Sequence, residues 1–472
     1  MYIESVRIEN LKCFEHIFLE FKASRMDDDN YDPQRNWNVI LGDNGDGKTT
    51  LLQAIAIGLM DVTTAQRVVK PYGWVRNQKS YSRLTVNLSR ESNDLLAKTN
   101  KNDTEDETPS HYQVEYMIDN MNGGRIFSLL QLYELATYAN SQIDNNMIQQ
   151  ALNGQQVNNL ARLSLMDKSK REKGRGWISC GYGPFRRLYG LSPQAAKVTD
   201  PLEERFITLF DEGAALYKCE DWLKELQRLA ALKNDAGSPE QIVFEKVKKL
   251  IVELLPEIDE IKLNKEIQFL HNGSPVSLNQ LSDGYRSMFA LVVDLLRWLE
   301  MLRSDAEKPI NEAHGVVLID EIDTHLHPKW QREIGFWLTK IFPNMQFIVT
   351  SHSPFVAMAA GKGALTVLEK RDDVVVADQE HPYIRDWTVD QVLTNVFEVN
   401  EHSWETERKL NKYDELRSKQ IAGTLNQAGQ QQLAQLEFDL NQHLVGDPAS
   451  PKQRTLESDL AELELLLQQE LE

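Results

Sequence analysis

The chain has 472 residues and carries 71 acidic side chains against 52 Lys or Arg, for a formal net charge of −19. This length exceeds one ordinary hydrophobic core, so we expect two lobes with appendages. The negative charge argues against a protein that coats nucleic acid over its whole surface, but it leaves room for a local basic groove.

Membrane and secretory signals are missing from the sequence. No run of about twenty apolar residues occurs, and the N-terminus lacks the apolar segment of a signal peptide. The three cysteines, Cys13, Cys180 and Cys219, are isolated and have no metal-ligand or disulfide spacing. We therefore expect a cytoplasmic protein with no membrane partner.

A complete phosphate-loop pattern, G-x-x-x-x-G-K-[ST], occupies residues 42–49. The apolar run 37–41 predicts a strand before it, and residues 50–56 predict a helix after it, which is the context that the motif needs. The glycines let backbone N–H groups turn toward a polyphosphate at the helix start. Lys48 is expected to reach the β and γ phosphates of ATP, and Thr49 to hold Mg²⁺. The predicted nucleotide contacts of this loop are Asp43, Asn44, Gly45, Asp46, Gly47, Lys48, Thr49 and Thr50.

Residues 91–175 are predicted to be a partly disordered insertion into the domain that holds the phosphate loop. Residues 98–109 are polar, and residues 140–159 are rich in Asn and Gln. The basic run 168–175 is a candidate contact for DNA or another nucleic acid, although such a run is more often a solvated loop.

A helical lobe is predicted over about residues 201–290. Apolar residues recur at helical spacing between 201 and 262, and the sequence Leu-Ser-Asp-Gly-Tyr follows at 281–285, before the apolar stretch 288–302. Ser282 and the N–H of Gly284 at this helix start form a candidate anion site. The alternative is an ordinary Ser cap followed by a glycine turn.

Two further strands are predicted to end in polar residues. The run 315–319 is continuously aliphatic, as in a strand covered on both faces, and Asp320 and Glu321 follow it as a Walker B pattern. Asp320 is expected to bind Mg²⁺ and Glu321 to polarise the attacking water. His352 follows the apolar run 347–349 and is expected to contact the γ phosphate. Taken separately, a segment of either kind is more often a buried strand that ends in solvated acids or in a packing histidine. The two segments indicate a nucleotide site only because they follow the phosphate loop in this order.

This order of motifs resembles that of ABC-type ATPases, and the details are similar to the RecF, SMC and OLD branch. The opening segment 8–14 is similar to the first strand and basic turn of that branch, and residues 321–328 and 350–354 resemble its E-x-x-x-H-L-H-P and T-H-S-P segments. The resemblance covers residues 1 to about 60 and about 175 to 370. The chain departs from the family pattern at one point, because it has no convincing glutamine loop. Gln53 is too close to the phosphate loop to serve as that glutamine, and residues 180–187 occupy the position of the loop instead.

The resemblance implies a fold, a ligand and an assembly. The fold is an α/β ABC-ATPase head, a P-loop NTPase with a mixed sheet and a helical signature lobe, here with a helical C-terminal tail. Lys12 would approach the nucleotide. Ser282 and Gly284 would complete the ATP site of a second subunit, so that ATP joins two heads into a homodimer or a higher homo-oligomer.

The C-terminal region is predicted to be helical and acidic, with leucine stripes at 433–444 and 456–467. It is either a hairpin packed on its own head or a docking surface for a partner. We expect the ATPase core at 1–90 and 176–395, the insertion at 91–175, and an interaction region at 396–472.

The motifs are most similar to those of ATPase subunits in two-component antiviral systems such as Septu, retron-associated PtuA and the PARIS sensor. This resemblance implies an ATP-hydrolysing sensor or scaffold that controls a separate effector such as a nuclease. A RecF-like ATPase that binds DNA directly in repair or recombination is the alternative, and a nucleotide-bound scaffold with negligible turnover is a third class.

Overall fold

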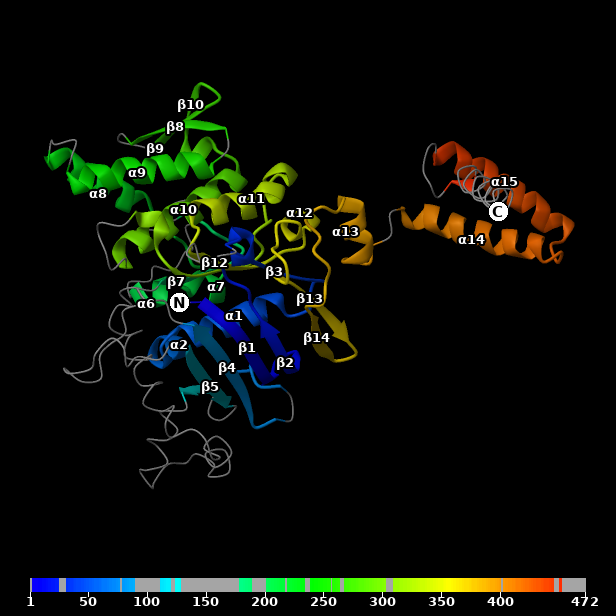
Figure 1. The fold of residues 1–472 in the computed structure, drawn as a ribbon, viewed down its shortest axis with the longest axis horizontal. Helices are drawn as coiled ribbons and strands as arrows, with labels where there is room; N and C mark the ends of the chain where they lie inside the picture. Colours follow the sequence, from blue (N-terminus) through cyan, green and yellow to red (C-terminus); the bar gives the residue numbers. More distant parts are fainter. Residues whose placement is uncertain are drawn as a thin grey trace, which may run out of the picture. The chain divides into compact units, whose positions relative to one another are not determined.

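The computed structural model describes residues 2–24, 31–76, 79–89, 111–119, 124–128, 178–188, 201–216, 219–233, 238–255, 257–263, 267–302, 309–399, 402–444 and 450–451. The chain divides into two compact units, 1–387 and 388–472, which are described separately below (Figure 1). The polar segments 98–109 and 140–159, the basic run 168–175 and the leucine stripe 456–467 lie outside the described residues.

A six-stranded sheet forms the centre of the first unit. Its order is β14 (Val374–Asp378), β13 (Leu365–Arg371), β3 (Trp37–Gly42), β12 (Met345–Thr350), β11 (Gly315–Ile319) and β7 (Ile178–Tyr182). All neighbours pair in parallel except β14, which runs antiparallel to β13. β11 and β12 are buried along their whole length, as the continuous apolar runs predict. The carboxyl ends of β3, β11 and β12 therefore meet at one edge, where polar residues follow each strand.

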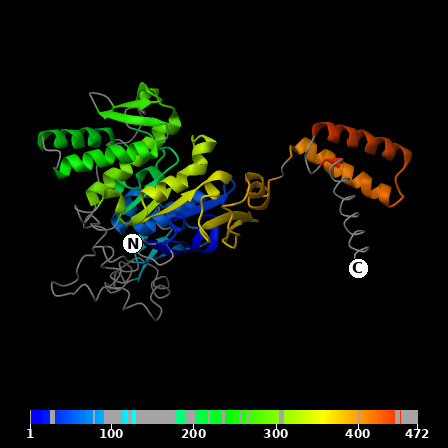
Figure 2. The ribbon, with the colours of Figure 1, turned by 45° about the horizontal axis from the view of Figure 1, so that its top comes forward.

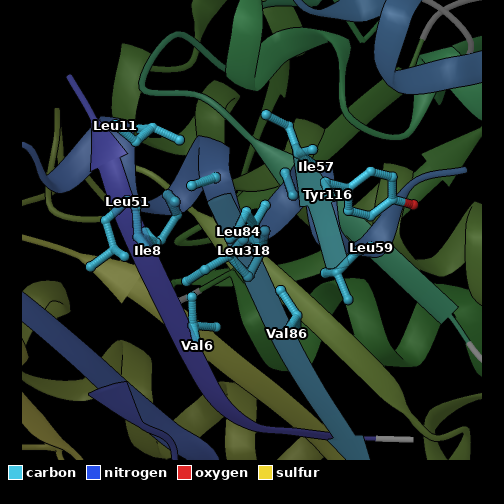
Figure 3. Close-up of a cluster of buried hydrophobic side chains, with 14 of the residues drawn as sticks. Val6, Ile8, Leu11, Leu51, Ile57, Leu59, Leu84, Val86, Tyr116 and Leu318 are labelled. Carbon is cyan, nitrogen blue, oxygen red and sulfur yellow. The ribbon is translucent and has the colours of Figure 1, made fainter. Parts of the chain in front are cut away.

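The helix α1 (Lys48–Leu59) packs between this sheet and a second, antiparallel sheet. The second sheet has the order β2 (Phe14–Glu20), β1 (Tyr2–Leu11), β4 (Tyr81–Ser89), β5 (His111–Asp119) and β6 (Arg125–Ser128). Figure 3 shows the shared core, in which side chains of α1 lie among those of β1, β4, β5 and β11. A Cβ on Gly58 would lie 2.3 Å from the Val86 side chain, so a glycine is needed where α1 approaches β4.

The opposite face of the central sheet is covered by α11 (Pro328–Ile341) and α12 (Pro354–Ala357). Buried residues of α11 recur at helical spacing, and Pro328 begins the helix where a proline costs no hydrogen bond. A Cβ on Gly335 would lie 2.8 Å from the Trp37 ring of β3, which shows how closely α11 approaches the sheet. Because both faces are covered, the strands are held in register by burial on two sides.

The predicted helical lobe contains strands as well as helices. The helices α8 (Cys219–Lys233), α9 (Pro239–Leu254) and α10 (Asp283–Leu302) lie with a three-stranded antiparallel sheet of β8 (Ile258–Leu263), β9 (Ile267–His271) and β10 (Ser274–Ser277) (Figure 2). The prediction of a helix-patterned segment up to 262 was wrong at its end. Residues 258–263 form β8, in which buried and exposed positions alternate from 260 to 263 after a register shift between Ile258 and Glu260.

The predicted insertion also contains regular structure. Residues 111–119 and 125–128, placed by the prediction inside the insertion at 91–175, form β5 and β6 of the antiparallel sheet. Val114, Tyr116, Met117 and Ile118 are buried, and so are the polar Glu115 and Asp119, so β5 lacks the simple alternation of a strand with one solvated face. The polar segments on both sides of β5 concealed it.

The second unit contains α13 (Val389–Asn395), α14 (Trp404–Ile421) and α15 (Gln427–His443). The first leucine stripe is internal to this unit: Leu433 and Leu440 of α15 pack with Leu410, Tyr413 and Leu416 of α14. The two helices thus form an αα-hairpin. The division at 387 and 388 falls close to the boundary expected at 395 and 396.

The remaining short elements of the first unit are η1 (Pro33–Asn36), α2 (Val62–Val68), α6 (Pro201–Glu204), α7 (Ile207–Phe210), η4 (Leu278–Gln280) and η5 (Ile310–Glu312). In the part of the chain that the structure describes, no helix is both long enough and apolar enough to cross a bilayer.

A buried polar network joins α10 to the edge strand β7. The Asp294 carboxylate accepts hydrogen bonds from Tyr182 Oη and Trp298 Nε1, both at 3.0 Å, and from Arg297 Nη2 at 2.7 Å. Arg297 also pairs with Glu204 of α6 at 2.7 Å. The donors around Asp294 are buried, so their partner cannot be replaced by bulk water.

We expect Asp294→Ala to lower the free energy of unfolding by about 3–5 kcal/mol, because it leaves buried donors without their acceptor. Urea denaturation measures this loss. The exposed Asp386→Ala is the matched control and is expected to change stability by less than about 0.5 kcal/mol. Equal stabilities of the two variants would show that the network contributes nothing net.

Candidate active site

The phosphate loop joins β3 to α1 and is shaped by its glycines. Gly45 and Gly47 have φ of +95° and +83°, in the region that favours glycine. A Cβ on Gly47 would also lie 2.5 Å from Cys13 Sγ, so the space allows only glycine there. Asp46 Oδ2 accepts a hydrogen bond from the Asp43 N–H at 2.6 Å, which fixes the turn. The loop therefore presents its backbone at the N-terminus of α1, where the helix dipole favours anions.

Lys48 begins α1 and folds back across the loop. Its Nζ donates to the carbonyl oxygens of Gly42 at 2.8 Å and Asp43 at 2.9 Å. Burial lowers the pKa of Lys48, while the nearby carboxylates, Asp46 first, act in the opposite direction. An ammonium that is partly desolvated and held by carbonyl groups is placed to take an anionic ligand.

Asp320 lies at the meeting point of three elements. It follows β11, and its Oδ2 accepts a hydrogen bond from Thr49 Oγ1 of α1 at 2.7 Å. Its Oδ1 accepts from Thr350 Oγ1, at the end of β12. Burial raises the pKa of Asp320, and the bonds from Thr350 and Thr49 oppose this rise. The carboxylate is therefore fixed in place, with its negative charge only partly compensated by the protein.

Glu321 and His352 face the phosphate loop across one cavity. Glu321 has a φ of +44°, which is strained for a residue with a side chain, and its N–H donates to Thr350 Oγ1 at 2.8 Å. Its Oε2 accepts from Thr324 Oγ1 at 3.0 Å. The cavity has a volume of about 330 Å³ and is lined by Lys12, Cys13, Asn44, Gly45, Gly47, Lys48, Thr49, Thr50, Glu321 and His352. Residues predicted from four separate segments thus share one cavity.

Lys12 reaches this cavity from the turn between β1 and β2. It has a φ of +47°, and its Nζ lies 4.1 Å from the centre of the Trp74 ring, within the range of a cation–π contact. Arg76 braces the turn by donating to the carbonyl of Cys13 at 3.2 Å. Burial lowers the pKa of Lys12.

Arg186 is a site residue that the sequence analysis missed. It follows β7 and is buried, with 3% of its surface exposed. Its Nη1 donates to the Asp320 carbonyl at 2.9 Å and its Nη2 to the Glu321 carbonyl at 3.3 Å. The only sequence signal was its place in the stretch 180–187, where a glutamine loop was expected. Gln53 instead donates to the carbonyl of Leu209 at 2.8 Å.

Ser282 and Gly284 do not line the cavity of their own chain. Ser282 is exposed just before α10, and Gly284 is buried in its first turn. A Cβ on Gly284 would lie 2.4 Å from the carbonyl oxygen of His325, so the turn after Glu321 packs directly on this glycine. The structure leaves the Ser282 side chain at the surface.

The residues around Asp320 suit a magnesium ion. Mg²⁺ prefers hard oxygen ligands, and in nucleotide sites it uses one or two protein groups together with phosphate oxygens. The Thr49 hydroxyl and the Asp320 carboxylate supply such oxygens from adjacent positions. These two side chains are the ones that would hold the ion.

The fold and the cavity define a P-loop nucleotide-binding protein. Residues 37–359 match the family described as "AAA domain, putative AbiEii toxin, Type IV TA system". This match spans more than half of the chain, and the chain belongs to that family.

Three relatives show how far the similarity extends. The chain is 35% identical to the Retron Vc95 probable ATPase of Vibrio cholerae serotype O1 biovar El Tor over 156 residues, which are 31% of this chain and 30% of that one. It is 25% identical to the Septu protein PtuA of Bacillus mycoides (strain KBAB4) over 84% of this chain and 44% of that one. It is 24% identical to the Retron Ec83 probable ATPase of Escherichia coli over 84% and 76% of the two chains. The chain thus spans less than half the length of the first two relatives.

Among solved structures, the chain is similar to an SMC head bound to the C-winged helix domain of ScpA. The TM-score is 0.46 at 14% identity, over 80% of this chain and 97% of that one. An SMC head domain from Thermotoga maritima aligns with a TM-score of 0.40 at 12% identity, over 81% and 100% of the two chains.

Proposed function

We propose that this chain binds ATP with Mg²⁺ in the cavity around the phosphate loop and hydrolyses it. The observation that carries this proposal is the direct contact of Thr49 with Asp320, at 2.7 Å, beside a cavity lined by Lys48, Glu321 and His352. This combination joins a phosphate-binding loop, a metal-binding pair and a candidate base in one place. The probable ATPases among the relatives support the same activity.

Phosphoryl transfer requires mainly positioning and charge stabilisation, and the proposed roles follow from this requirement. Lys48 and the loop N–H groups bind the phosphates, Glu321 orients and deprotonates the attacking water, and His352 contacts the γ phosphate. Bound Mg²⁺ would neutralise the charge that develops on the phosphate oxygens. Lys12 would approach the nucleotide from the opposite wall. Asp43 and Asp46 shape the loop that supplies the backbone donors.

We further propose that two heads pair around ATP. Ser282 lies exposed at the start of α10 and outside the cavity of its own chain, as expected for a residue that serves a second subunit. The N-terminus of α10 would then add its dipole to the nucleotide of the partner. ATP would stabilise the dimer because it contacts both heads, and hydrolysis would remove that differential affinity.

We propose that the protein is the ATPase subunit of a two-component antiviral system and controls a separate effector, such as a nuclease. The relatives named as a Septu protein and as retron ATPases support this assignment, and the longest of these alignments spans 435 residues. In this scheme ATP-dependent pairing of heads sets the state of the effector. The region after residue 387 is a separate unit and is the candidate contact.

The chemical roles predict different defects for two variants. Lys48→Ala should weaken binding of ATP by about 10–100-fold, because it removes a charge-assisted contact to phosphate. Glu321→Gln should keep binding and lower turnover by about 10²-fold or more, because it removes the base. Fluorescent-nucleotide titration and phosphate release measure the two quantities, and a Glu321→Gln chain that turns over at the parental rate would remove the assignment.

The composite site predicts complementation between two inactive chains. Ser282→Arg blocks the surface offered to the partner, and Lys48→Ala disables the chain's own site, so each alone should be inactive. A mixture should recover about one working site per heterodimer. The assay includes a tagged-chain exchange measurement, because exchange without any recovery of turnover would contradict sites shared between subunits.

The effector hypothesis predicts a stable complex with the product of the neighbouring gene. Co-expression of the two chains should give co-purification that depends on residues 388–472. A truncated chain, 1–387, should still bind ATP but lose the second protein. Strong stimulation of the isolated full chain by DNA, with no complex, would favour direct action on DNA instead.

A further inference from the structure

The turn that carries Glu321 is held in a conformation that it does not adopt by itself. Glu321 and His325 both have positive φ, +44° and +65°, and neither is a glycine. The N–H of Glu321 is fixed by Thr350 and the N–H of Ile322 by the Thr350 carbonyl at 3.1 Å. Backbone strain of this kind persists only where the surrounding contacts determine it.

Arg186 supplies the contacts on the carbonyl side of this turn. Its guanidinium donates to the carbonyls of Gly183, Asp320 and Glu321, at 3.1, 2.9 and 3.3 Å. The Nε of the same side chain donates to Ser287 Oγ at 3.0 Å. The N–H donors of an arginine guanidinium are fixed in one plane, so a shift of one hydrogen-bond partner displaces the others. The ammonium of a lysine is flexible and does not couple its partners in this way.

Ser287 belongs to the helix that begins with the signature segment. It lies in the second turn of α10, one turn after Gly284, and is 6% exposed. The first turn of α10 also meets this segment, because Gly284 packs on the His325 carbonyl. The same helix therefore touches the Glu321 turn at two places, once by packing and once through Arg186.

We propose that Arg186 and Ser287 form a link through which the position of α10 sets the backbone of Asp320 and Glu321. In this view Arg186 is a positioning residue. Engagement of Ser282 and Gly284 by nucleotide on a second subunit shifts or steadies α10, and the link carries that change to the general base in the same chain. This inference rests on the proposed ATP hydrolysis and adds its regulation.

Ser287→Ala cuts the link at the helix, and Arg186→Lys keeps the charge but removes the fork. We expect kcat to fall by about 10-fold in the first and about 100-fold in the second, with the Kd for a fluorescent ATP analogue within about twofold of the parental value. Ser238→Ala is the matched control, since Ser238 caps α9 in the same lobe by accepting from the Gln241 N–H at 3.3 Å. The Ser238→Ala chain should lose about as much stability as the Ser287→Ala chain and keep the parental kcat.

Hydrogen exchange tests the link without hydrolysis. Without nucleotide, amides of residues 320–326 should exchange faster in Ser287→Ala and Arg186→Lys than in the parental and Ser238→Ala chains. Unchanged exchange and unchanged kcat in Ser287→Ala would overturn the proposal. If the parental chain showed no turnover of ATP, the proposed hydrolysis would be wrong. The hydrogen-exchange result would still decide whether α10 controls the backbone of the Glu321 turn.

Discussion

The hydrogen bonds of Thr49 and Thr350 to the Asp320 carboxylate are the constraint on which the rest of the structure depends. They join residues 271 and 30 positions apart in the sequence. Burying a carboxylate lowers the stability of the fold unless its oxygens accept hydrogen bonds, so the hydroxyls of Thr49 and Thr350 must lie at fixed positions beside Asp320. Their arrival depends on register: Ile319 of β11 pairs with Val349, and Ile40 of β3 pairs with Thr350. A slip of one residue would turn Thr350 away and leave Asp320 without a donor.

The register is in turn held by burial on both faces of the sheet. Ile40 of β3 and Val316 and Leu318 of β11 belong to the core shared with α1, whereas Trp37 of β3 lies against Gly335 of α11. Two-sided burial makes every slip costly, because it would carry each side chain to the opposite layer. It also explains why α1 is apolar around most of its circumference. The helix lies between two sheets, so it has no wide solvent face on which a polar stripe could form.

The sequence alone predicted the parts of the site that follow from a local pattern. A phosphate loop needs its glycines and its lysine at fixed spacing, and Asp320 and Glu321 follow an aliphatic run that only a doubly covered strand explains. Arg186 and Thr350 could not be found this way. An arginine after a strand is usually exposed, and the role of Arg186 exists only because β7 pairs beside β11. The strands β5 and β8 were missed for another reason: β5 is buried at every position from 114 to 119, and β8 is interrupted by a register shift, so neither has the regular period of a strand.

The helix α10 is attached to the central sheet by two kinds of contact, and their difference matters for how it could move. Near its middle, Asp294 accepts from Tyr182 of β7 within a buried network, which resists displacement. Near its start, Gly284 packs on the His325 carbonyl, the Tyr285 ring lies 4.3 Å from that of Trp330, and Ser287 accepts a hydrogen bond from Arg186, while Ser282 is exposed. If two heads pair around ATP as proposed, a displacement at the exposed Ser282 would reach the Glu321 turn through the Gly284 packing and through Arg186, while the network around Asp294 holds the middle of the helix. Under the proposed pairing of heads, the contacts that would report on a second subunit are therefore the same contacts that give the Glu321 turn its defined position.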